Sequence, residues 1–489
     1  MKFETVIGLE VHCQLSTQSK LFCSCPSKYQ LSEPNSLICE VCVGFPGSLP
    51  VINEKSIEFA IIAGLALNCK IANYTRFDRK NYSYPDLMKG YQISQFLHPV
   101  AESGHLSIKI NEKIKQIGIT RIHVEEDVAK LVHSSSPSGE QFSLIDINRS
   151  GVPLIEIVSE PDMRSPEEAR TYLSTLRIIL RYLDISTANM EEGSFRCDAN
   201  ISIRPEGTKK LGTKVELKNM NSLKSIFQAL NYEVKRQTNL ISSGKSIIQE
   251  TRGWSEQKNI TVSQRIKEDS EDYRYFPEPD IPPVELTNSF IDKIASTLPE
   301  LPAKKIDRFM DSYELSEQDA TSLTVSQDIA EFFENTLLYE PTASPKTRAK
   351  MISNYVLVEL KRLLNANNIK FQDLKFKPAD ASKLFDFIDS KQINNNQGKI
   401  VFEKMFLTGN TPDSIIKSSN ISQLSDSNII EAAINQAIES NQQAVTDYLS
   451  GKNAALQFLF GQVMKITKGS ASPQIVSKLL KKNLETQHE

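Results

Sequence analysis

Thr5-Val-Ile-Gly-Leu-Glu-Val-His-Cys-Gln14 is the stretch that decides the fold, because apolar and polar residues alternate along it from Ile7 onward. Successive side chains of a β-strand point to opposite faces of the sheet, so this strand has one apolar and one polar face. The apolar set is Ile7, Leu9, Val11 and Cys13, and the polar set is Glu10, His12 and Gln14. A sheet of such strands buries one face and leaves the other open.

Three later segments, residues 121–125, 195–204 and 214–218, alternate in the same way. Their polar positions are Arg121, His123, Glu125, Arg196, Asp198, Asn200, Ser202, Arg204, Lys214, Glu216 and Lys218. Any antiparallel sheet with one solvated face shows this alternation, and that interpretation stays open for each strand taken alone. The composition argues against it, because a solvated face favours Lys, Glu and Thr, whereas His, Asp, Asn and Arg recur here beside carboxylates.

The polar face has the composition of a site for a magnesium nucleotide. Glu10, His12 and Glu125 are ligand types for a hard cation or for zinc. The cationic positions that suit phosphate oxygens are Arg196, Arg204, Lys214 and Lys218. The sequence contains neither a Walker loop nor a Rossmann fingerprint, so a nucleotide would have to bind on the sheet itself.

Four of the seven cysteines form two close pairs, Cys23 with Cys25 and Cys39 with Cys42. Cysteines this close in sequence do not form an unstrained disulfide, but each pair can give two thiolates to a tetrahedral metal. The spacing therefore predicts a closed, structural zinc site, with four ordinary thiols in a reducing cytosol as the alternative. The remaining cysteines, Cys13, Cys69 and Cys197, are expected to be buried and inert.

The length of 489 residues favours about two to four domains, and the composition is that of an ordinary globular protein. The longest apolar stretch, residues 59–67, is too short to cross a bilayer. No signal peptide precedes the strand-like sequence at Phe3, and the odd number of cysteines argues against a secreted disulfide framework. These features predict a cytoplasmic protein without a membrane segment.

Turn-forming residues predict two domain boundaries, which divide the chain into a large α+β domain, residues 1–290, and two helical domains, residues 291–407 and 408–489. Ser165-Pro-Glu-Glu168 has the pattern of a capping box that opens a helix. Prolines crowd residues 277–302, and Gly409-Asn-Thr-Pro412 marks the second boundary. Asn-rich breaks at residues 365–368 and 394–396 are interpreted as loops. The predicted fold class is thus α+β: a cradle on an antiparallel or mixed sheet with one polar face, an all-helical domain and a small helical tail.

The tail has an uneven charge distribution. Residues 448–484 contain no Asp or Glu, and this range holds Lys452, Lys465, Lys468, Lys478, Lys481 and Lys482. The residues expected to form its buried helical stripe are Leu456, Leu459, Phe460, Val463 and Ile466, with Gly469 ending that helix and Pro473 preventing its restart. A basic surface of this kind favours a role in binding nucleic acid, with a merely solvated surface as the alternative.

Several long motifs resemble the B subunit of the bacterial aspartyl/glutamyl-tRNA amidotransferase, and the match runs from Phe3 to about Leu484. These motifs are Ile7-Gly-Leu-Glu-Val-His12, residues 76–86, residues 89–95, residues 119–127, residues 148–162, Met190-Glu-Glu-Gly-Ser-Phe-Arg-Cys-Asp-Ala-Asn200, residues 272–280 and residues 451–469. The resemblance implies a catalytic cradle, a helical domain and a tail related to the YqeY family.

The resemblance also implies a reaction and its partners. ATP would phosphorylate the side-chain carboxylate of Asp or Glu on a misacylated tRNA, and ammonia would displace phosphate to give Asn or Gln. Ammonia would come from glutamine at a separate amidase (A) subunit, and a small C subunit would complete a heterotrimer. The enzyme would be a carbon–nitrogen ligase with glutamine as amido donor, using ATP and Mg²⁺ beside a structural Zn²⁺.

Site residues follow from the matched motifs. The resemblance implies Glu10, His12 and Glu125 as magnesium ligands, with Glu156 and Asp198 as further candidates for the ligand set. All five are implied catalytic residues. Candidates for phosphate contacts are Arg149, Arg196 and Lys214, and the implied ammonia route or its mouth comprises Lys80, Asn81, Tyr82 and Lys89.

Two functions from other classes stay open. A zinc-stapled RNA-binding adaptor would bind tRNA without tRNA-dependent ATP hydrolysis. An ATP-dependent ligase that amidates a small carboxylate would need neither tRNA nor a basic tail. Whether the substrate is Asp-tRNA, Glu-tRNA or both stays open as well.

Overall fold

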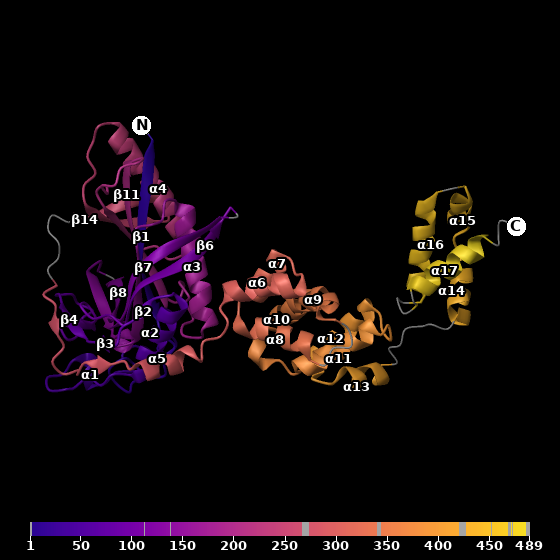
Figure 1. The fold of residues 1–489 in the computed structure, drawn as a ribbon, viewed down its shortest axis with the longest axis horizontal. Coiled ribbons are helices and arrows are strands. Elements are labelled where there is room, and N and C mark those ends of the chain that lie inside the picture. Colours follow the sequence, from indigo (N-terminus) through magenta and orange to yellow (C-terminus); the bar gives the residue numbers. More distant parts are fainter. Residues whose placement is uncertain are drawn as a thin grey trace. The chain divides into compact units, whose positions relative to one another are not determined.

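Strand β1 (Phe3–Gln14) is the strand expected from the alternating stretch, and it lies at the middle of a large mixed sheet (Figure 1). The structure is a computed structural model that describes residues 2–111, 113–136, 138–266, 273–339, 344–419, 427–450, 452–467, 471 and 473–485. Within these ranges the sheet has nine strands, in the order β14 (Ile260–Ile266), β13 (Glu250–Ser255), β12 (Val215–Lys218), β11 (Phe195–Pro205), β1, β10 (Pro153–Ser159), β7 (Lys113–Glu126), β6 (Ala101–Ile110) and β2 (Lys70–Ile71). Neighbouring strands pair antiparallel except β12 and β13, which are parallel.

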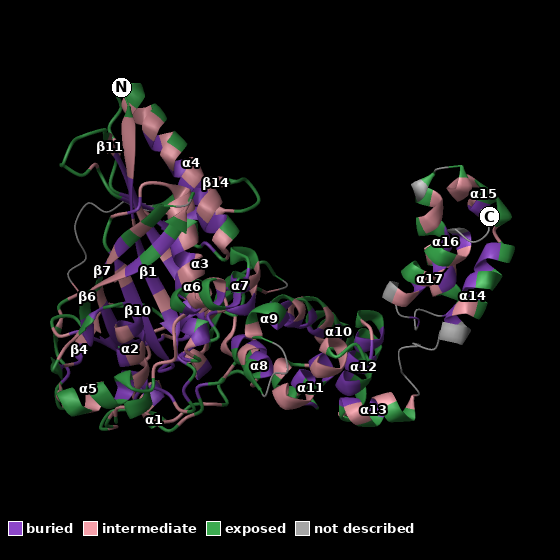
Figure 2. Ribbon diagram, turned by 45° about the vertical axis from the view of Figure 1, so that its right-hand side comes forward, coloured by how far each residue is buried: buried purple, intermediate pink, exposed green. Residues whose placement is uncertain are grey.

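The apolar face of this sheet is covered by three helices, α2 (Glu54–Ala66), α3 (Pro166–Tyr182) and α4 (Leu223–Ser242). Side chains from the strands and from these helices form one hydrophobic core, and the central strands are buried along much of their length (Figure 2). Ile7, Leu9 and Val11 of β1 are at most 1% exposed, as the alternation predicted. The predicted capping residue of α3 is confirmed, because the Ser165 hydroxyl accepts the Glu168 N–H at 3.2 Å.

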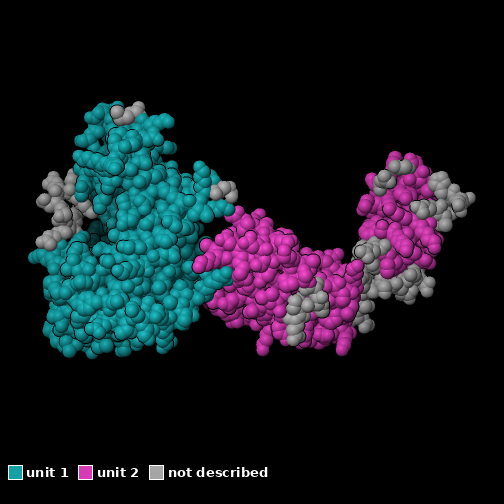
Figure 3. Space-filling model, viewed as in Figure 1, with its two compact units in different colours: residues 1–301 teal, residues 302–489 magenta. Residues whose placement is uncertain are grey.

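Short elements complete the first unit. They are α1 (Glu40–Val43), β3 (Tyr74–Thr75), β4 (Asp78–Asn81), β5 (Tyr91–Ser94), β8 (Lys130–Ser135), β9 (Gln141–Asp146), the 3-10 turn Ile147–Arg149, β15 (Phe276–Pro277), β16 (Val284–Glu285) and α5 (Asn288–Ala295). The chain divides into two compact units, Met1–Leu301 and Pro302–Glu489 (Figure 3). The first unit extends past the boundary predicted at residue 290 because Ile294 of α5 packs into the core of the sheet domain.

The second unit is helical in the residues that the structure describes. Its elements are α6 (Pro302–Tyr313), α7 (Glu317–Leu323), α8 (Gln327–Leu338), α9 (Pro345–Asn354), the π-helix Tyr355–Leu360, α10 (Lys361–Asn367), the 3-10 turn Phe371–Asp373, α11 (Pro378–Asp389), α12 (Asn395–Thr408), α13 (Pro412–Ser418), α14 (Ser427–Glu439), α15 (Gln442–Leu449), α16 (Asn453–Ile466) and α17 (Pro473–Glu485). One core joins α6 to α13 and a separate core joins α14 to α17. Ile415 of α13 packs in the first of these cores, so that group of helices continues beyond the boundary predicted at residue 408.

The Asn-rich stretches are helix ends rather than loops. Asn394 caps α12, because its side-chain oxygen accepts the Gln397 N–H at 3.0 Å. Asn368 ends α10 in the left-handed conformation, with φ of 50°, which Asn tolerates better than most residues. The expectation of loops was wrong because Asn favours both caps of a helix.

Two expectations for the tail were also wrong. Ile466 is 37% exposed, because α16 ends there and Thr467, not Ile466, turns inward. Pro473 begins α17 instead of blocking it, since the first turn of a helix does not use the N–H that Pro lacks. Gly469, expected to end the preceding helix, lies outside the described residues. No helix in the described ranges is long and apolar enough to span a bilayer.

Replacing Ile157 tests how much the buried face of the sheet stabilises the first unit. Ile157 of β10 is fully buried, so Ile157→Ala should lower the free energy of unfolding by about 3 kcal/mol through lost burial and a residual cavity. Urea unfolding can be followed by the fluorescence of Trp254, the single tryptophan, which lies in the same core. The matched control Ile114→Ala, on β7 and 75% exposed, should change the free energy by less than about 0.5 kcal/mol. Equal losses for the two variants would contradict this account of the core.

Candidate active site and four-cysteine centre

The antiparallel register places one row of polar side chains across four neighbouring strands. His123 of β7 pairs with Glu156 of β10, Glu156 pairs with His12 of β1, and His12 pairs with Arg196 of β11. All four residues point to the face of the sheet opposite the helices, because partners in register share a face. The sequence alternation thus becomes a row of chemically distinct groups in space.

His12, Glu125 and Glu156 form a cluster that could hold a metal ion. One ligand atom from each residue lies within 4.8 Å of the others. His12 Nε2 lies 3.6 Å from Glu125 Oε1 and 3.4 Å from Glu156 Oε2. Of the magnesium ligands implied by the resemblance, the structure brings His12 and Glu125 together with Glu156, which was a further candidate, whereas Glu10 is not in this group.

Glu10 points from the same face but has other neighbours. Its carboxylate accepts a hydrogen bond from Asn200 Nδ2 at 2.8 Å. In register with Glu10 lies Asp198, whose carboxylate pairs with Lys218 Nζ at 2.8 Å. Burial raises the pKa of Glu10, and the charges of Glu156 and Asp198 raise it further. Glu10 therefore borders the cluster, and Asp198 is already paired with a lysine.

The cluster brings the imidazole of His12 next to the buried carboxylates of Glu125 and Glu156. Burial acts to lower the pKa of His12, but its hydrogen bond to Glu156 and the charges of Glu156 and Glu125 outweigh burial and raise that pKa to about 9. Burial acts to raise the pKa of Glu156, yet the charge of His123 and hydrogen bonds with His12 and His123 hold it well below its usual value. A protonated His12 thus occupies the position between carboxylates that a divalent cation would take.

His123 also belongs to the site. Its place on the polar face was predicted from the alternation, but it was not among the predicted site residues. Its Nε2 lies 3.2 Å from Glu156 Oε2, and its side chain is 4% exposed. Ser94 Oγ of β5 similarly donates to Glu125 Oε2 at 3.1 Å. The signal for His123 was present, since it alternates with Arg121 and Glu125, but no pattern along the chain shows that it faces Glu156.

The three predicted phosphate contacts lie in different surroundings. Arg196 Nη2 contacts Asp127 Oδ1 at 3.0 Å, while its side chain stays 38% exposed. Arg149 donates from Nε and Nη2 to the carbonyl oxygens of Val128 and Ala129, each at 2.8 Å. Lys214 is exposed and precedes strand β12. Arg196 is therefore the member of this set that combines a fixed position with a place in the row beside His12.

The residues predicted for the ammonia route lie on and around β4 and β5. Lys80 Nζ lies 4.9 Å from the ring centroid of Tyr273, and Tyr82 donates its hydroxyl to Gln92 Oε1 at 3.2 Å. Asn81 Nδ2 donates to the Arg274 carbonyl at 2.9 Å. The ammonium group of Lys89 pairs with Glu126, next in sequence to Glu125.

A cavity of about 230 Å³ lies beside Lys89. Lys89 and Glu126 contribute to its wall, together with Cys23 and Cys42. Of the four residues predicted for the route, Lys89 therefore borders the same cavity as the four-cysteine centre.

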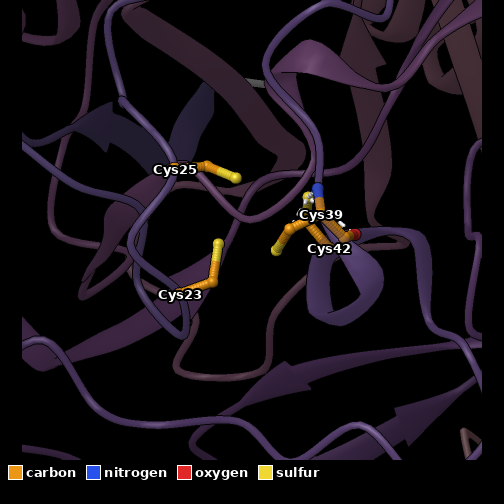
Figure 4. A group of neighbouring side chains, drawn as sticks. All are labelled: Cys23, Cys25, Cys39 and Cys42. Carbon is orange, nitrogen blue, oxygen red and sulfur yellow. Dashed lines mark hydrogen bonds between the residues drawn. The ribbon is translucent and has the colours of Figure 1, made fainter.

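The four-cysteine centre assembles as its spacing predicted. The sulfur atoms of Cys23, Cys25, Cys39 and Cys42 all lie within 4.8 Å of one another, and the side chains converge from a loop and the start of α1 (Figure 4). All seven cysteines are free thiols. Gly44 ends α1 with φ of 79°, a conformation that lets the chain turn back directly after Cys42.

The surroundings of this centre favour the thiolate form, which binds metal, at Cys42. Hydrogen bonding with Cys42 and burial raise the pKa of Cys23, and burial and a hydrogen bond with Cys39 raise the pKa of Cys25 to about 11. Hydrogen bonding with Cys23, the Cys39 backbone and the charge of Lys20 lower the pKa of Cys42 to about 5, although burial opposes them. Lys20 is fully buried and its Nζ donates to the Leu37 carbonyl at 2.9 Å. The donor set therefore fits a soft, tetrahedral metal ion.

The other cysteines differ from this group. Cys13, Cys69 and Cys197 are buried, as predicted. Burial raises the pKa of Cys13 and of Cys69 to about 12, which keeps both as thiols. These are properties of packing residues.

The tail lysines are exposed where they are described. Lys452, Lys465, Lys478, Lys481 and Lys482 all lie at the surface of α16, of α17 or of the turn before α16, whereas Lys468 lies outside the described residues. Lys478 and Lys481 line a groove between α16 and α17 together with Leu456 and Phe460. Lys452 pairs with Asp447 at 3.0 Å.

Comparison with known proteins covers nearly the whole chain. A family model described as the GatB/GatE catalytic domain matches residues 5–292, and one described as the GatB domain matches residues 337–484. The B subunit of the aspartyl/glutamyl-tRNA(Asn/Gln) amidotransferase of Dehalococcoides mccartyi (strain CBDB1) is 51% identical over 488 residues, which cover 99% of each chain. The protein of the same name from Carboxydothermus hydrogenoformans is 48% identical over 483 residues, again 99% of each chain.

These matches confirm the resemblance seen in the motifs of the sheet domain and of the tail. Because one family model covers more than half of the chain and the relatives align from end to end, the chain belongs to the family of aspartyl/glutamyl-tRNA(Asn/Gln) amidotransferase B subunits.

Proposed function

We propose that this chain is the ATP-dependent amidating subunit of a tRNA-dependent amidotransferase and that its reaction centre is the polar face of the sheet. The observation that supports this most directly is the cluster of His12, Glu125 and Glu156 with Arg196 next in the row. Carboxylates that hold a metal beside a cationic group for phosphate oxygens are the equipment of phosphoryl transfer.

The chemistry explains why such a site is needed. A carboxylate is a poor electrophile, so an oxygen of the Asp or Glu side chain on tRNA first attacks the γ-phosphorus of ATP and ADP leaves. Ammonia then adds to the carboxyl carbon of the acyl phosphate, inorganic phosphate leaves, and loss of a proton gives the amide. No covalent bond to the protein is required, so the protein positions the reactants and neutralises charge.

Named residues of this chain have separate tasks in that scheme. His12, Glu125 and Glu156 would hold Mg²⁺, with Glu10 at the border, and the metal would supply charge neutralisation at the phosphate oxygens. Metal binding would require His12 to lose its proton, so Mg²⁺ would replace the protonated imidazole as the cation beside Glu125 and Glu156. Arg196 would contact a phosphate oxygen, and buried His123 orients Glu156.

Ammonia would arrive from a partner. We propose the amidase (A) subunit as its source, a small C subunit as the third chain of a heterotrimer, and the cytoplasm as the place of action. Lys80, Asn81, Tyr82 and Lys89 would line the route, which is supported by their position around β4 and β5 near Glu125 and Glu126. The four cysteines would hold zinc as a structural ion, and the tail lysines would bind the tRNA body.

The central experiment uses the chain assembled with its partner subunits. Amidation is measured with glutamine, ATP and either Asp-tRNA(Asn) or Glu-tRNA(Gln), together with tRNA-dependent ATP hydrolysis. A purely RNA-binding adaptor would show no such ATP hydrolysis, and a ligase for small carboxylates would not depend on tRNA. The two tRNA substrates compared in parallel also show which amino acid is accepted.

Glu125→Gln should abolish tRNA-dependent ATP hydrolysis and amidation while glutamine hydrolysis by the partner stays measurable, because the variant removes a charged ligand without changing its shape. A loss of at least about 100-fold in kcat is expected from losing a metal ligand. The control Glu102→Gln, on β6 and exposed, should amidate normally. Normal amidation by Glu125→Gln would remove this residue from the site.

Zinc should copurify at about one ion per chain, because four converging thiolates complete a tetrahedral shell. Metal analysis of Cys25→Ser should show most of that zinc lost, whereas the control Cys69→Ala, outside the centre, should retain it. A wild-type protein that folds and remains active without any zinc would refute the assignment.

The double variant Lys478→Glu, Lys481→Glu should weaken binding of tRNA about tenfold or more at low salt and reduce the salt dependence of binding, because both lysines would contact phosphates. Affinity is measured by filter binding over a series of salt concentrations with the assembled complex. The control Lys209→Glu, Lys210→Glu places the same charge change on an exposed loop of the first unit and should leave the affinity unchanged. Equal affinities for the two variants would remove these lysines from the tRNA-binding surface.

A further inference from the structure

Asp127 is a buried carboxylate that follows strand β7, and the reaction proposed for the polar face gives it no task. We propose that Asp127 is a positioning residue that holds Arg196 beside the His12 cluster, and that Gln14 and Tyr29 connect Asp127 to the cysteine loop. The cysteine loop is the segment of residues 23–42, which carries the four cysteines. The inference rests on the proposed function, because it assumes that Arg196 contacts a phosphate oxygen of ATP. It adds a task for the cysteine loop, namely to keep a phosphate-binding group in place.

Asp127 is built as an anchor. It is 2% exposed, and both carboxylate oxygens are engaged. Oδ1 contacts Arg196 Nη2 at 3.0 Å and accepts the Val128 N–H at 2.9 Å, and Oδ2 accepts Gln14 Nε2 at 2.6 Å.

Within the part of the chain that the structure describes, the guanidinium of Arg196 pairs with the carboxylate of Asp127. Its contact to Asp127 uses Nη2, and the side chain remains 38% exposed on the polar face, in register with His12. A free arginine side chain loses rotamer freedom when a ligand immobilises it, and that loss weakens binding. Because Asp127 already restricts the side chain, less of that cost falls on ligand binding. Asp127 thus orients the guanidinium, and the exposed part of the guanidinium remains available to bind a ligand.

Arg149 has a different task, although it lies close to the same carboxylate. Its Nε lies 3.6 Å from Asp127 Oδ1, beyond hydrogen-bonding distance, and its donors go to the carbonyl oxygens of Val128 and Ala129. These bonds brace the segment that follows Asp127. Arg149 therefore fixes the anchor, and Arg196 is the group that the anchor fixes.

Two connections lead from Asp127 to the cysteine loop. In the first, the amide of Gln14 that donates to Asp127 also contacts the Tyr29 hydroxyl at 3.2 Å, and Tyr29 lies in the loop between the two cysteine pairs. Gln14 is 6% exposed, so its side chain has no room to turn away. Loss of order in the cysteine loop would remove one of its two partners.

The second connection is made by backbone. The N–H of Gly151 donates to the Asp127 carbonyl at 2.9 Å, and the Ser150 hydroxyl donates to the Cys42 carbonyl at 3.3 Å. Gly151 has φ of 83°, and a Cβ there would lie 3.7 Å from the Cys42 Cβ. The turn at Ser150 and Gly151 is therefore packed between the metal-binding cysteine and the anchor.

The test measures binding of ATP with Mg²⁺ to the assembled complex by calorimetry, without tRNA. Arg196→Ala and Asp127→Asn should each raise the Kd for ATP about tenfold, the size expected for one charge-assisted hydrogen bond. The combined variant should bind ATP no more weakly than Arg196→Ala alone, because Asp127 acts through Arg196. Additive losses in the combined variant would overturn the inference. In kinetic assays Asp127→Asn should raise KM for ATP more than it lowers kcat, whereas general loosening of the fold would lower the active fraction and so kcat.

Two milder variants keep the test decisive if Asp127→Asn does not fold. Gln14→Met keeps the size of the side chain but removes both of its hydrogen bonds, and Tyr29→Phe removes one hydroxyl. Each should raise the Kd for ATP by about three- to tenfold with zinc content and melting temperature unchanged, while the control Tyr232→Phe on α4 should bind ATP like the wild type. If Arg196→Ala weakens ATP binding but Gln14→Met does not, the inference fails and the proposed function stands. If Arg196→Ala itself binds ATP normally, the proposed phosphate contact fails as well.

Discussion

Burial of the apolar face of the central strands is the constraint on which the other features of the first unit depend. Helices α2, α3 and α4 seal that face, and their contact fixes which side chains of β1, β7, β10 and β11 point away from them. A shift of one residue in any of these strands would move its whole apolar set to the open side, so the register is strongly specified. The candidate site therefore needs no separate scaffold, because the packing that folds the sheet also aligns His123, Glu156, His12 and Arg196.

The sequence predicted the faces of the strands but not their partners. Alternation assigns Glu10 and His12 to one face, yet only the pairing of β1 with β10 brings Glu156, rather than Glu10, to within 3.4 Å of His12. His123 illustrates the same limit, since its importance comes from a neighbour on another strand. Local signals succeeded where the interaction is local, as at the Ser165 cap of α3. They failed at Asn394 and Pro473, where one residue type suits both a loop and the first turn of a helix.

The four-cysteine centre shows both outcomes in one place. Its spacing was sufficient to predict that the four sulfur atoms meet, because the chemistry of tetrahedral ligation is encoded in short intervals. Its surroundings were not predictable, since buried Lys20 and the contact of Ser150 with Cys42 join segments far apart in sequence. The four-cysteine centre, whose ligands suit a structural metal, therefore borders the same cavity as Lys89 and Glu126 and does not lie apart from them.

The position of β1 between β10 and β11 has a consequence for synthesis of the chain. Strand β1 is made before both of its partners and finds them only when residues 153–159 and 195–205 have emerged. At about 5–20 residues per second, β1 waits for roughly ten to forty seconds with an unpaired apolar face and two open edges. Long-range pairing of this kind is slow, and an apolar face and unpaired strand edges favour aggregation until it is complete. A fragment that stops before residue 195 would lack one neighbour of β1 and, with it, the Arg196 end of the row that contains His12.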